Sequence, residues 1–261
     1  APFDDQLATL ASGLVNLTGT AVVTDFDGDT ATDSNTIDLG GNIQFTDDGP
    51  TVTINIEAEQ NILLTTHDAL TTGANTDTAT STANFGGIFT ATPNYGADGP
   101  GSTVLSYTLS LAVANGTVSG LNSQGMPVYL YDIGGVITGS TSATLAGITT
   151  SNTIFSISVD NTGAVTLSQM QQIDHAPEST TTAPFDDQLV TLANGLVNLT
   201  GTVITTDFDG DTATDSKTID LGGNIIFADD GPTVTINVGT ESNILLTTHD
   251  ALTIGANTDT A

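Results

Sequence analysis

The sequence predicts an all-β fold, with tandem immunoglobulin-like β-sandwich domains in an elongated array and one or two short helices. Three observations lead to this expectation. Short stretches alternate apolar and polar residues, turn-forming residues separate these stretches, and the first part of the chain recurs near its end. The alternation predicts strands that are buried on one face, and the recurrence predicts repeated domains.

The clearest strand signal lies in residues 106–113, where Tyr, Leu, Leu and Val interleave with Ser, Thr, Ser and Ala. The same period of two marks residues 15–17, 52–56 and 155–159. Turns are expected at Asp160–Gly163, Asn115–Gly116 and Gly134–Gly135, because Asn, Asp and Gly tolerate the positive backbone angles of tight hairpins. Only Leu167–His175 and Phe3–Ser12 have the character of short helices.

An internal repeat sets the domain organisation. Residues 1–79 realign without gaps on residues 183–261, and the two copies differ at only 13 of these 79 positions. One division therefore gives a partial repeat at 1–79, a unique β-sandwich segment at 80–182 and a second copy at 183–261. A stop at Gly49–Pro50 favours a different division, in which 51–232 is one complete repeat. If both divisions hold in part, one domain is split in sequence. Ala1 opens within a repeat, so we expect the chain to be an excerpt of a longer array.

The charge balance limits the partners of the chain. Thirty acidic residues face one basic residue, and the formal net charge is -29. Nucleic acid is excluded, because neutralising phosphates requires Lys and Arg. Direct membrane insertion is also not expected, since no run of 18 apolar residues occurs. Without Cys there are no disulfides and no thiolate zinc sites. Hard cations are the expected counter-ions, although a merely solvated acidic surface is the simpler alternative.

The strongest candidate for chemistry is an acidic loop that occurs once in each copy. Carboxylates spaced two residues apart around a Gly allow several oxygens to surround one Ca2+ ion. The twelfth position of a helical calcium loop would hold Glu, but Thr36 and Thr218 stand there, so a helical hand is not expected. An acidic β-turn without metal is the alternative. The candidate calcium ligands in these loops are Asp25, Asp27, Asp29 and Asp33, and in the second copy Asp207, Asp209, Asp211 and Asp215.

Two further candidate calcium sites lie at the expected boundary between one domain and the next, one in each copy. Asp47 and Asp48 precede Gly-Pro, and Asp229 and Asp230 occupy the same place in the second copy. Calcium bound there would stiffen the junction, and a plain turn before Pro is an equal alternative.

Catalysis is not expected. The only histidines are His67, His175 and His249, and the sequence has neither a nucleophile elbow nor a phosphate-binding loop with Lys. A histidine after a strand is more often a hydrogen-bonded structural residue than a catalytic one. Near-identical repetition also fits a structural role better than a copied active site.

The run from Asp27 to Ile43, closing on Asp47-Asp-Gly-Pro, resembles the repeat of giant type I secreted repeats-in-toxin (RTX) adhesins of Gram-negative bacteria. Residues 61–70, 128–131, 152–160 and 172–175 extend this resemblance over nearly the whole chain. The resemblance implies a calcium-stabilised extender, some of which have split domains. It also implies secretion to the cell surface, contact with neighbouring repeats, and a host or surface ligand that other domains bind. The glycine-rich nonapeptide of the toxin family and a C-terminal secretion signal are missing from this sequence.

Two functional hypotheses follow. The first is a calcium-stabilised spacer repeat that projects distal ligand-binding domains for attachment and biofilm formation. The alternative is a module that itself binds a glycan or protein, which would need exposed aromatic side chains. The candidates for that role are Tyr95, Tyr107, Tyr129 and Tyr131.

Overall fold

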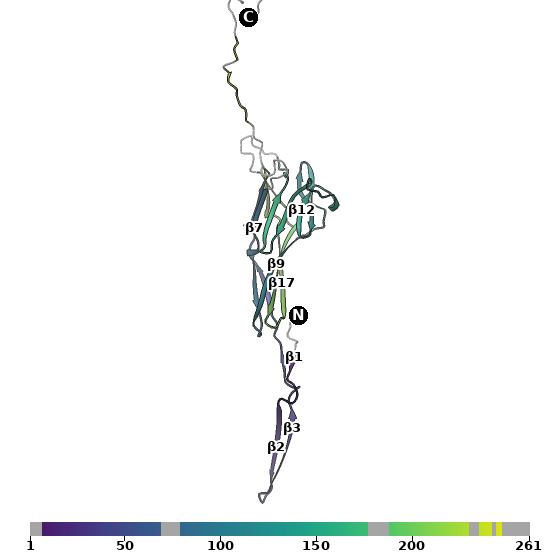
Figure 1. Ribbon diagram of the computed structural model, residues 1–261, viewed down its shortest axis with the longest axis vertical. Helices are drawn as coiled ribbons and strands as arrows, with labels where there is room; N and C mark the ends of the chain where they lie inside the picture. Colours follow the sequence, from purple (N-terminus) through teal and green to yellow (C-terminus); the bar gives the residue numbers. More distant parts are fainter. Residues whose placement is uncertain (1–6, 69–78, 177–187, 230–234, 242–243, 247–261) are drawn as a thin grey trace, which may run out of the picture. The chain divides into compact units, whose positions relative to one another are not determined.

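The structure is a computed structural model that describes residues 7–68, 79–176, 188–229, 235–241 and 244–246 (Figure 1). These residues are almost entirely strands and turns, which confirms the predicted all-β class. They fall into two compact units, residues 1–230 and 231–261. No helix among the described residues has the length and apolar character needed to cross a bilayer.

The strands are named here in chain order, segment by segment. In the first copy they are β1 Leu7–Thr9, β2 Asn16–Thr24, β3 Thr30–Asp38, β4 Gln44–Thr46, β5 Thr51–Ile56 and β6 Leu64–His67. In the unique segment they are β7 Ala79–Asn84, β8 Phe89–Asn94, β9 Pro100–Leu111, β10 Thr117–Ser123, β11 Met126–Ile133, β12 Val136–Ser140, β13 Thr153–Val159 and β14 Ala164–Gln169. In the second copy they are β15 Leu189–Thr191, β16 Val197–Asp207, β17 Thr212–Asp220 and β18 Ile225–Ala228.

The sheets are open and mix strands from all three segments. The largest sheet has the order β10-β11-β12-β13-β14-β7, and all its pairs are antiparallel. Two three-stranded sheets, β17-β16-β9 and β15-β18-β6, join the second copy to the unique segment and to the first copy. The β18–β6 pair is parallel, whereas β5–β8 is an antiparallel pair of first-copy and unique strands.

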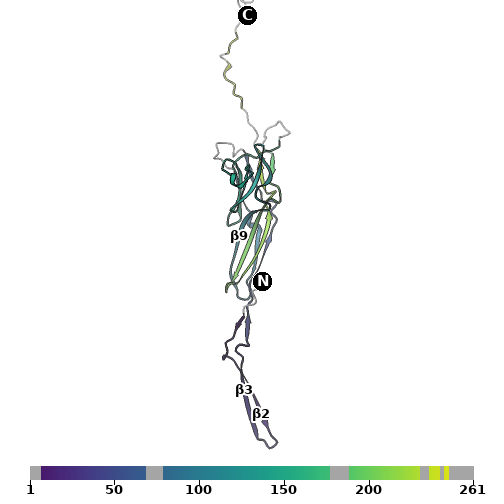
Figure 2. The ribbon, with the colours of Figure 1, turned by 90° about the vertical axis from the view of Figure 1, so that its right-hand side faces the viewer.

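The two copies build the same hairpin locally. Thr18 pairs with Thr36 across β2 and β3, and Thr200 pairs with Thr218 across β16 and β17, each pair with its hydroxyl groups within hydrogen-bond distance. The environments differ, because β16 also pairs with β9 along its whole length. Within the described part of the chain, β2 and β3 form a sheet of only two strands, which is visible as a long ribbon in Figures 1 and 2.

Equivalent side chains of the copies are therefore buried in one copy and exposed in the other. Leu17 of β2 is 55% exposed, whereas its equivalent Leu199 is fully buried. The relation reverses after the Gly-Pro stop, where Ile54 of β5 is 1% exposed and its equivalent Ile236 is 85% exposed. The core thus takes its first strands from the first copy and its last strands from the second copy.

One hydrophobic core runs through these elements. It contains Ile54 and Leu64 from the first copy, Phe155 and Leu167 from the unique segment, and Phe227 from the second copy. The rings of Phe155 and Phe227 lie 5.1 Å apart at an angle of 48°. The core therefore depends on residues that are up to about the length of one repeat apart in sequence.

The expectation of two α-helical stretches was wrong. Residues 164–169 form β14, because alternate side chains are buried and both edges of the strand pair, with β13 and β7. Residues 170–175 continue without helix, and residues 7–9 of the other stretch form β1. Residues 3–6 lie outside the described residues. The described helices are the short 3-10 turns η2 Gly86–Ile88 and η3 Leu145–Gly147.

The three predicted turns were confirmed, two of them in hairpins. Asp160–Gly163 connects β13 to β14, and the Asp160 carboxylate accepts hydrogen bonds from the Thr162 amide and hydroxyl and from the Ala164 amide. These bonds lower the pKa of Asp160, the Thr162 hydroxyl contributing most. The Asn115–Gly116 and Gly134–Gly135 turns connect β9 to β10 and β11 to β12.

Candidate metal centres

The acidic loop of the second copy connects β16 to β17. Asp207 closes the loop on itself, because its Oδ1 atom accepts hydrogen bonds from the amides of Gly210 and Asp211 at 3.1 and 2.8 Å. Gly210 has a φ angle of +108°, a conformation that L side chains rarely adopt, so this position requires glycine. The loop therefore presents the Asp207, Asp209 and Asp211 carboxylates from one short turn.

Two further carboxylates from distant parts of the chain reach this loop. Ligand oxygens of Asp47, Asp209 and Asp211 lie within 4.8 Å of one another, as do those of Asp98, Asp207 and Asp209. Asp47 comes from the junction that precedes β5, and Asp98 comes from the loop between β8 and β9. We call Asp47, Asp98, Asp207, Asp209 and Asp211 together the junction cluster.

Close backbone packing accounts for the position of Asp98. A Cβ atom on Gly96 would lie 2.1 Å from the Asp48 carbonyl oxygen, and one on Gly101 would lie 2.2 Å from the Asp207 carbonyl oxygen. Only glycine permits both approaches. The two glycines flank Asp98 and hold its loop between the first-copy junction and the second-copy acidic loop.

One carboxylate oxygen of Asp207 and one of Asp47 are buried without a hydrogen-bond donor. Asp207 is 2% exposed, and its Oδ2 atom is buried without a hydrogen-bond partner, as is Oδ2 of Asp47. Burying a carboxylate oxygen without a donor or a cation is unfavourable. Calcium takes six to eight oxygen ligands at about 2.3–2.6 Å, so this donor set suits a hard divalent ion.

Hydrogen bonds between carboxyl groups have the largest effect on the pKa values in the junction cluster, and they lower the pKa of Asp47. The contact with Asp47 raises the pKa of Asp98 and of Asp211, and the contact with Asp207 raises the pKa of Asp209. In each case burial and the charges of neighbouring carboxylates add to the rise in pKa. Protons or a metal ion relieve such repulsion between like charges.

The acidic loop of the first copy has the same local form. Asp25, Asp27 and Asp29 lie within 4.8 Å of one another, and the Asp25 carboxylate accepts a 2.9 Å hydrogen bond from the Asp29 amide. All three residues are exposed. The first-copy loop therefore has its own three carboxylates close together, without the carboxylates from distant segments that join the second-copy loop.

Three other predicted ligands among the described residues lie outside these groups. Asp33 and Asp215 lie within strands, and Asp215 accepts a 2.9 Å hydrogen bond from the Ile54 amide, so it attaches β17 to β5. Asp48 donates its amide to the Asp47 carboxylate at 2.9 Å, and Asp230 lies outside the described residues.

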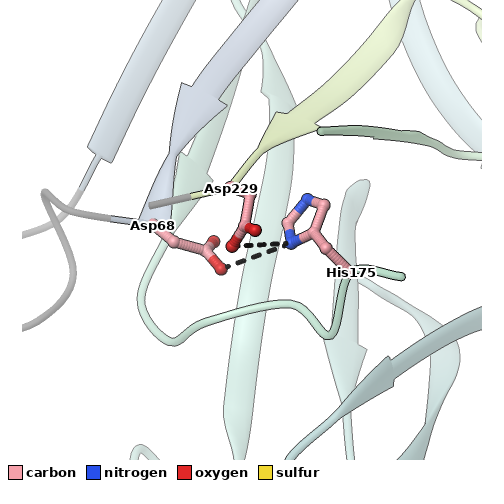
Figure 3. A group of neighbouring side chains, drawn as sticks. All are labelled: Asp68, His175 and Asp229. Atoms are coloured by element: carbon pink, nitrogen blue, oxygen red, sulfur yellow. Dashed lines mark ion pairs between the residues drawn. The ribbon is translucent and has the colours of Figure 1, made fainter. Parts of the chain in front are cut away.

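Asp229 belongs to a different cluster, although it is equivalent to Asp47. Its carboxylate lies 3.5 Å from Nδ1 of His175, and the Asp68 carboxylate lies 3.7 Å from the same nitrogen. Figure 3 shows both carboxylates pointing toward the imidazole ring. The three residues form the histidine cluster.

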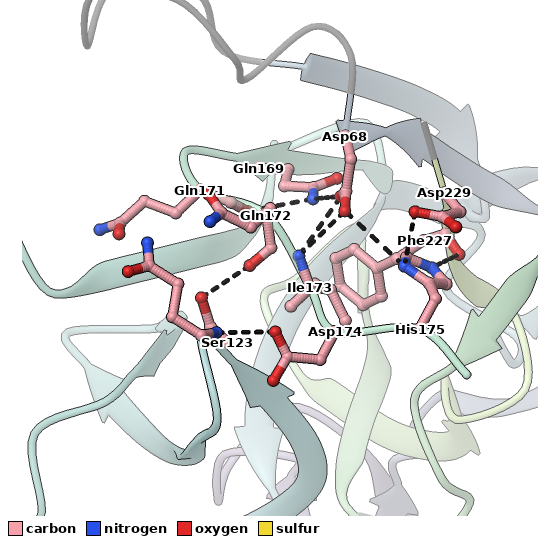
Figure 4. A network of polar contacts seen from close by, with 11 residues as sticks. Asp68, Ser123, Gln169, Gln171, Gln172, Ile173, Asp174, His175, Phe227 and Asp229 are labelled. Atoms are coloured by element: carbon pink, nitrogen blue, oxygen red, sulfur yellow. Dashed lines mark hydrogen bonds and ion pairs between the residues drawn. The ribbon is translucent and has the colours of Figure 1, made fainter. Parts of the chain in front are cut away.

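The surroundings of the histidine cluster hold its side chains in place. Asp68 accepts hydrogen bonds from Nε2 of Gln169 and from the Ile173 amide, and Nε2 of His175 lies 3.0 Å from the Phe227 carbonyl oxygen (Figure 4). Burial raises the pKa of Asp68, although the Gln169 and Ile173 hydrogen bonds and the charge of His175 oppose this rise.

Sequence reasoning missed Asp98 and the histidine cluster. Asp98 had a local signal, because the tripeptide Asp98-Gly-Pro repeats the Asp48-Gly-Pro of the junction. The histidine cluster had none, since its members come from three distant segments. Of the other two histidines in the sequence, His67 is exposed, and His249 lies outside the described residues.

The tyrosines proposed for ligand binding do not present exposed rings. Tyr131 is buried and donates to the Ser142 carbonyl, and Tyr107 packs edge-on against Phe89 and donates to the Gly86 carbonyl. Tyr95 and Tyr129 are partly buried.

Comparison with known proteins gives a family without an assigned activity. Searches of curated proteins and of solved structures found no match to this chain. A family model described as a domain of unknown function, DUF5801, matches residues 57–222, which include β6, the whole unique segment and most of the second-copy strands. This match covers more than half of the sequence, and the chain therefore belongs to the DUF5801 family.

Proposed function

We propose that this chain is a segment of a calcium-stabilised spacer, or extender, built from tandem repeats in a secreted bacterial surface adhesin. The observation that carries the proposal is the opposite burial of equivalent residues in the two copies. Leu199 is buried, in a strand that also pairs with β9, and Leu17 is exposed, although both belong to the same repeated hairpin. A sequence that conserves a core face at a position where this chain leaves it open implies an adjoining repeat that covers it.

In this proposal one complete repeat spans residues 51–232. Its first strands come from the first copy and its closing strands from the second, and the family match at 57–222 falls within it. Domain boundaries at residues 79 and 182 would separate residues of one hydrophobic core into different domains. Residues 1–50 then close a preceding repeat, and the sequence from residue 233 onward opens the next.

The proposed repeat is a β-sandwich of immunoglobulin-like type. A Cβ atom on Gly201, in the β17-β16-β9 sheet, would lie 2.6 Å from the ring of Phe89 in the β5-β8 pair. The inner face of one sheet therefore contacts a side chain of the other, as in packed sheets.

Calcium is proposed to bind in the junction cluster. Asp47 lies before the proposed repeat, whereas the other four residues of the junction cluster lie within the repeat. One ion bound to all of them would therefore connect a repeat to the segment before it. Bound calcium would replace the repulsion between carboxylates with shared coordination and add binding energy to folding. Rigid junctions suit a spacer that projects ligand-binding domains of the same protein away from the cell, for attachment and biofilm formation.

The alternative of a module that binds a glycan or protein by itself has less support. None of the four tyrosines that would form such a site is exposed. The site residues that the structure groups together are carboxylates and one histidine.

The tandem arrangement is tested by placing residues 51–182 in front of residue 1. The added segment supplies the strands that pair with the β2–β3 hairpin in the proposed array. Amide exchange in residues 16–38 is expected to slow to the rates of the equivalent residues 198–220, because both hairpins would then be covered. Unchanged fast exchange in residues 16–38 would contradict the proposed repeat.

Calcium binding is tested by thermal unfolding in EDTA and then in about 5 mM calcium, a concentration suited to weak extracellular sites. We expect calcium to raise the melting temperature. Replacing Asp209 and Asp211 with Asn should abolish most of this rise. The matched control replaces Asp27 and Asp29 with Asn in the same local sequence, outside the junction cluster, and should preserve it. Equal responses of the two double variants would refute a specific junction site.

A further inference from the structure

The histidine cluster lies where the two ends of the proposed repeat meet. In the parallel pair of β6 and β18, His67 is in register with Ala228, so the next residues, Asp68 and Asp229, emerge side by side. His175 approaches from the segment after β14 (Figure 3). The strand register thus brings two carboxylates to one place, and no Arg and only a single Lys are available in the sequence to neutralise them.

Hydrogen bonding identifies one imidazole nitrogen of His175 that carries a proton. The Phe227 carbonyl oxygen can only accept, so Nε2 of His175 carries a proton and donates it at 3.0 Å. In a neutral ring Nδ1 then has a free lone pair. This atom is buried without a hydrogen-bond partner, the side chain is 2% exposed, and both carboxylates face it.

The separations suit three ligands around one ion. The Nδ1–oxygen distances of 3.7 and 3.5 Å exceed the range of about 2.7–3.2 Å for a direct hydrogen bond. In a tetrahedral zinc site with bonds of about 2.0–2.2 Å, two ligand atoms lie about 3.4 Å apart. The ligand atoms of all three residues lie within 4.8 Å of one another.

We propose that Asp68, His175 and Asp229 bind a divalent transition-metal ion of the zinc class. An imidazole nitrogen with two carboxylates suits zinc, whereas calcium prefers oxygen ligands throughout. Water would complete the tetrahedron.

The surrounding contacts are those of a prepared metal site. Metal-binding histidines commonly donate their other ring N–H to a backbone carbonyl, as His175 does to Phe227. The Asp68 carboxylate is oriented by Gln169 and Ile173 (Figure 4). The bound ion would join the first copy, the unique segment and the second copy, and so fasten the split repeat where its strands meet. This proposal does not depend on calcium binding at the junction cluster.

The test uses the whole chain in millimolar calcium, so that the acidic loops are not the sites being measured. Isothermal titration with Zn2+ is expected to show one saturable site per repeat. Co2+ should give the visible absorption of a tetrahedral ion with nitrogen and oxygen ligands. The variant His175→Gln should weaken Zn2+ binding at least tenfold, roughly the scale on which even supporting residues affect metal affinity. His67→Gln, at an exposed neighbouring histidine, is the matched control and should bind as the original chain does.

A second measurement covers the case in which His175→Gln does not fold. In the original chain, the nitrogen-15 chemical shift of His175 Nδ1 should change on addition of Zn2+ to that of a metal-bound nitrogen. A Nδ1 atom that stays protonated with excess Zn2+ would overturn the proposal, and would show that an imidazolium bridges the two carboxylates instead. Absence of saturable Zn2+ binding would also overturn it. Retained Zn2+ binding in the Asp209→Asn, Asp211→Asn variant would separate this site from the calcium proposal.

Discussion

Truncating one leucine in each copy tests whether the two equivalent hairpins have different environments. Leu199 lies in β16, between Ile219 of β17 and Leu109 of β9, and is completely buried. Leu17 has the same neighbours along the sequence but is 55% exposed. The two changes, Leu199→Ala and Leu17→Ala, remove the same atoms from nearly the same sequence. Any difference in their effects therefore reports on tertiary packing.

The expected magnitudes are well separated. Replacing a buried leucine by alanine costs about 2–5 kcal/mol of unfolding free energy, because transfer energy is lost and a cavity remains. For a domain of this size each kcal/mol lowers the melting temperature by about 2–4 °C. A loss of about 3 kcal/mol for Leu199→Ala thus corresponds to roughly 10 °C. An exposed substitution such as Leu17→Ala usually changes stability by less than about 0.5 kcal/mol.

Urea unfolding followed by circular dichroism, combined with thermal unfolding in the same buffer, measures both effects. Equal losses in the two variants would show that β2–β3 is as well covered as β16–β17, and would refute the inference from exposure. In the chain extended by residues 51–182 ahead of residue 1, Leu17→Ala should acquire the larger cost. A persistently small cost there would count against the tandem arrangement.

Three further outcomes are expected. Gly201→Ala should destabilise the chain by about 1–3 kcal/mol, because the new methyl group would overlap an aromatic ring of β8, whereas Gly19→Ala meets no atom within 4 Å and should change chemical unfolding little. Asp215→Ala should lower the melting temperature at pH 7 more than Asp33→Ala does. The β5 amide lowers the pKa of Asp215 below its usual 3.8, so its contribution is present above that pH and is lost as pH falls through the lowered value. Finally, Asp98→Asn should weaken calcium binding measured by titration calorimetry, and an unchanged affinity would remove this residue from the junction cluster.

Local structure is the same in the two copies because it depends on residues within one copy. Asp38 and Asp220 illustrate this: each accepts one amide hydrogen bond from a glycine two residues later and another from a glycine 25 residues earlier. The contacts recur in both copies regardless of burial. Strand alternation, tight turns and the hydrogen bonds that close each acidic loop have the same local origin.

The helix prediction at residues 167–175 failed because pairing outweighed local preference. Gln169 is fully buried within a paired strand, and Asp68 accepts hydrogen bonds from Gln169 and Ile173. Neither the neighbouring strand β7 nor Asp68 is close in sequence. A polar stretch with helical character thus becomes a strand followed by an extended segment.

The sequence by itself determined the repeat, the β-rich pattern and the acidic loops, since each is expressed in adjacent residues. Only the tertiary structure decided which copy of each segment is buried. It also decided that Asp47 joins carboxylates whereas its equivalent Asp229 faces a histidine. Two nearly identical sequences do not reveal which of them is buried. The contacts across the split repeat make the difference, because burial and electrostatic repulsion depend on residues brought together from distant segments.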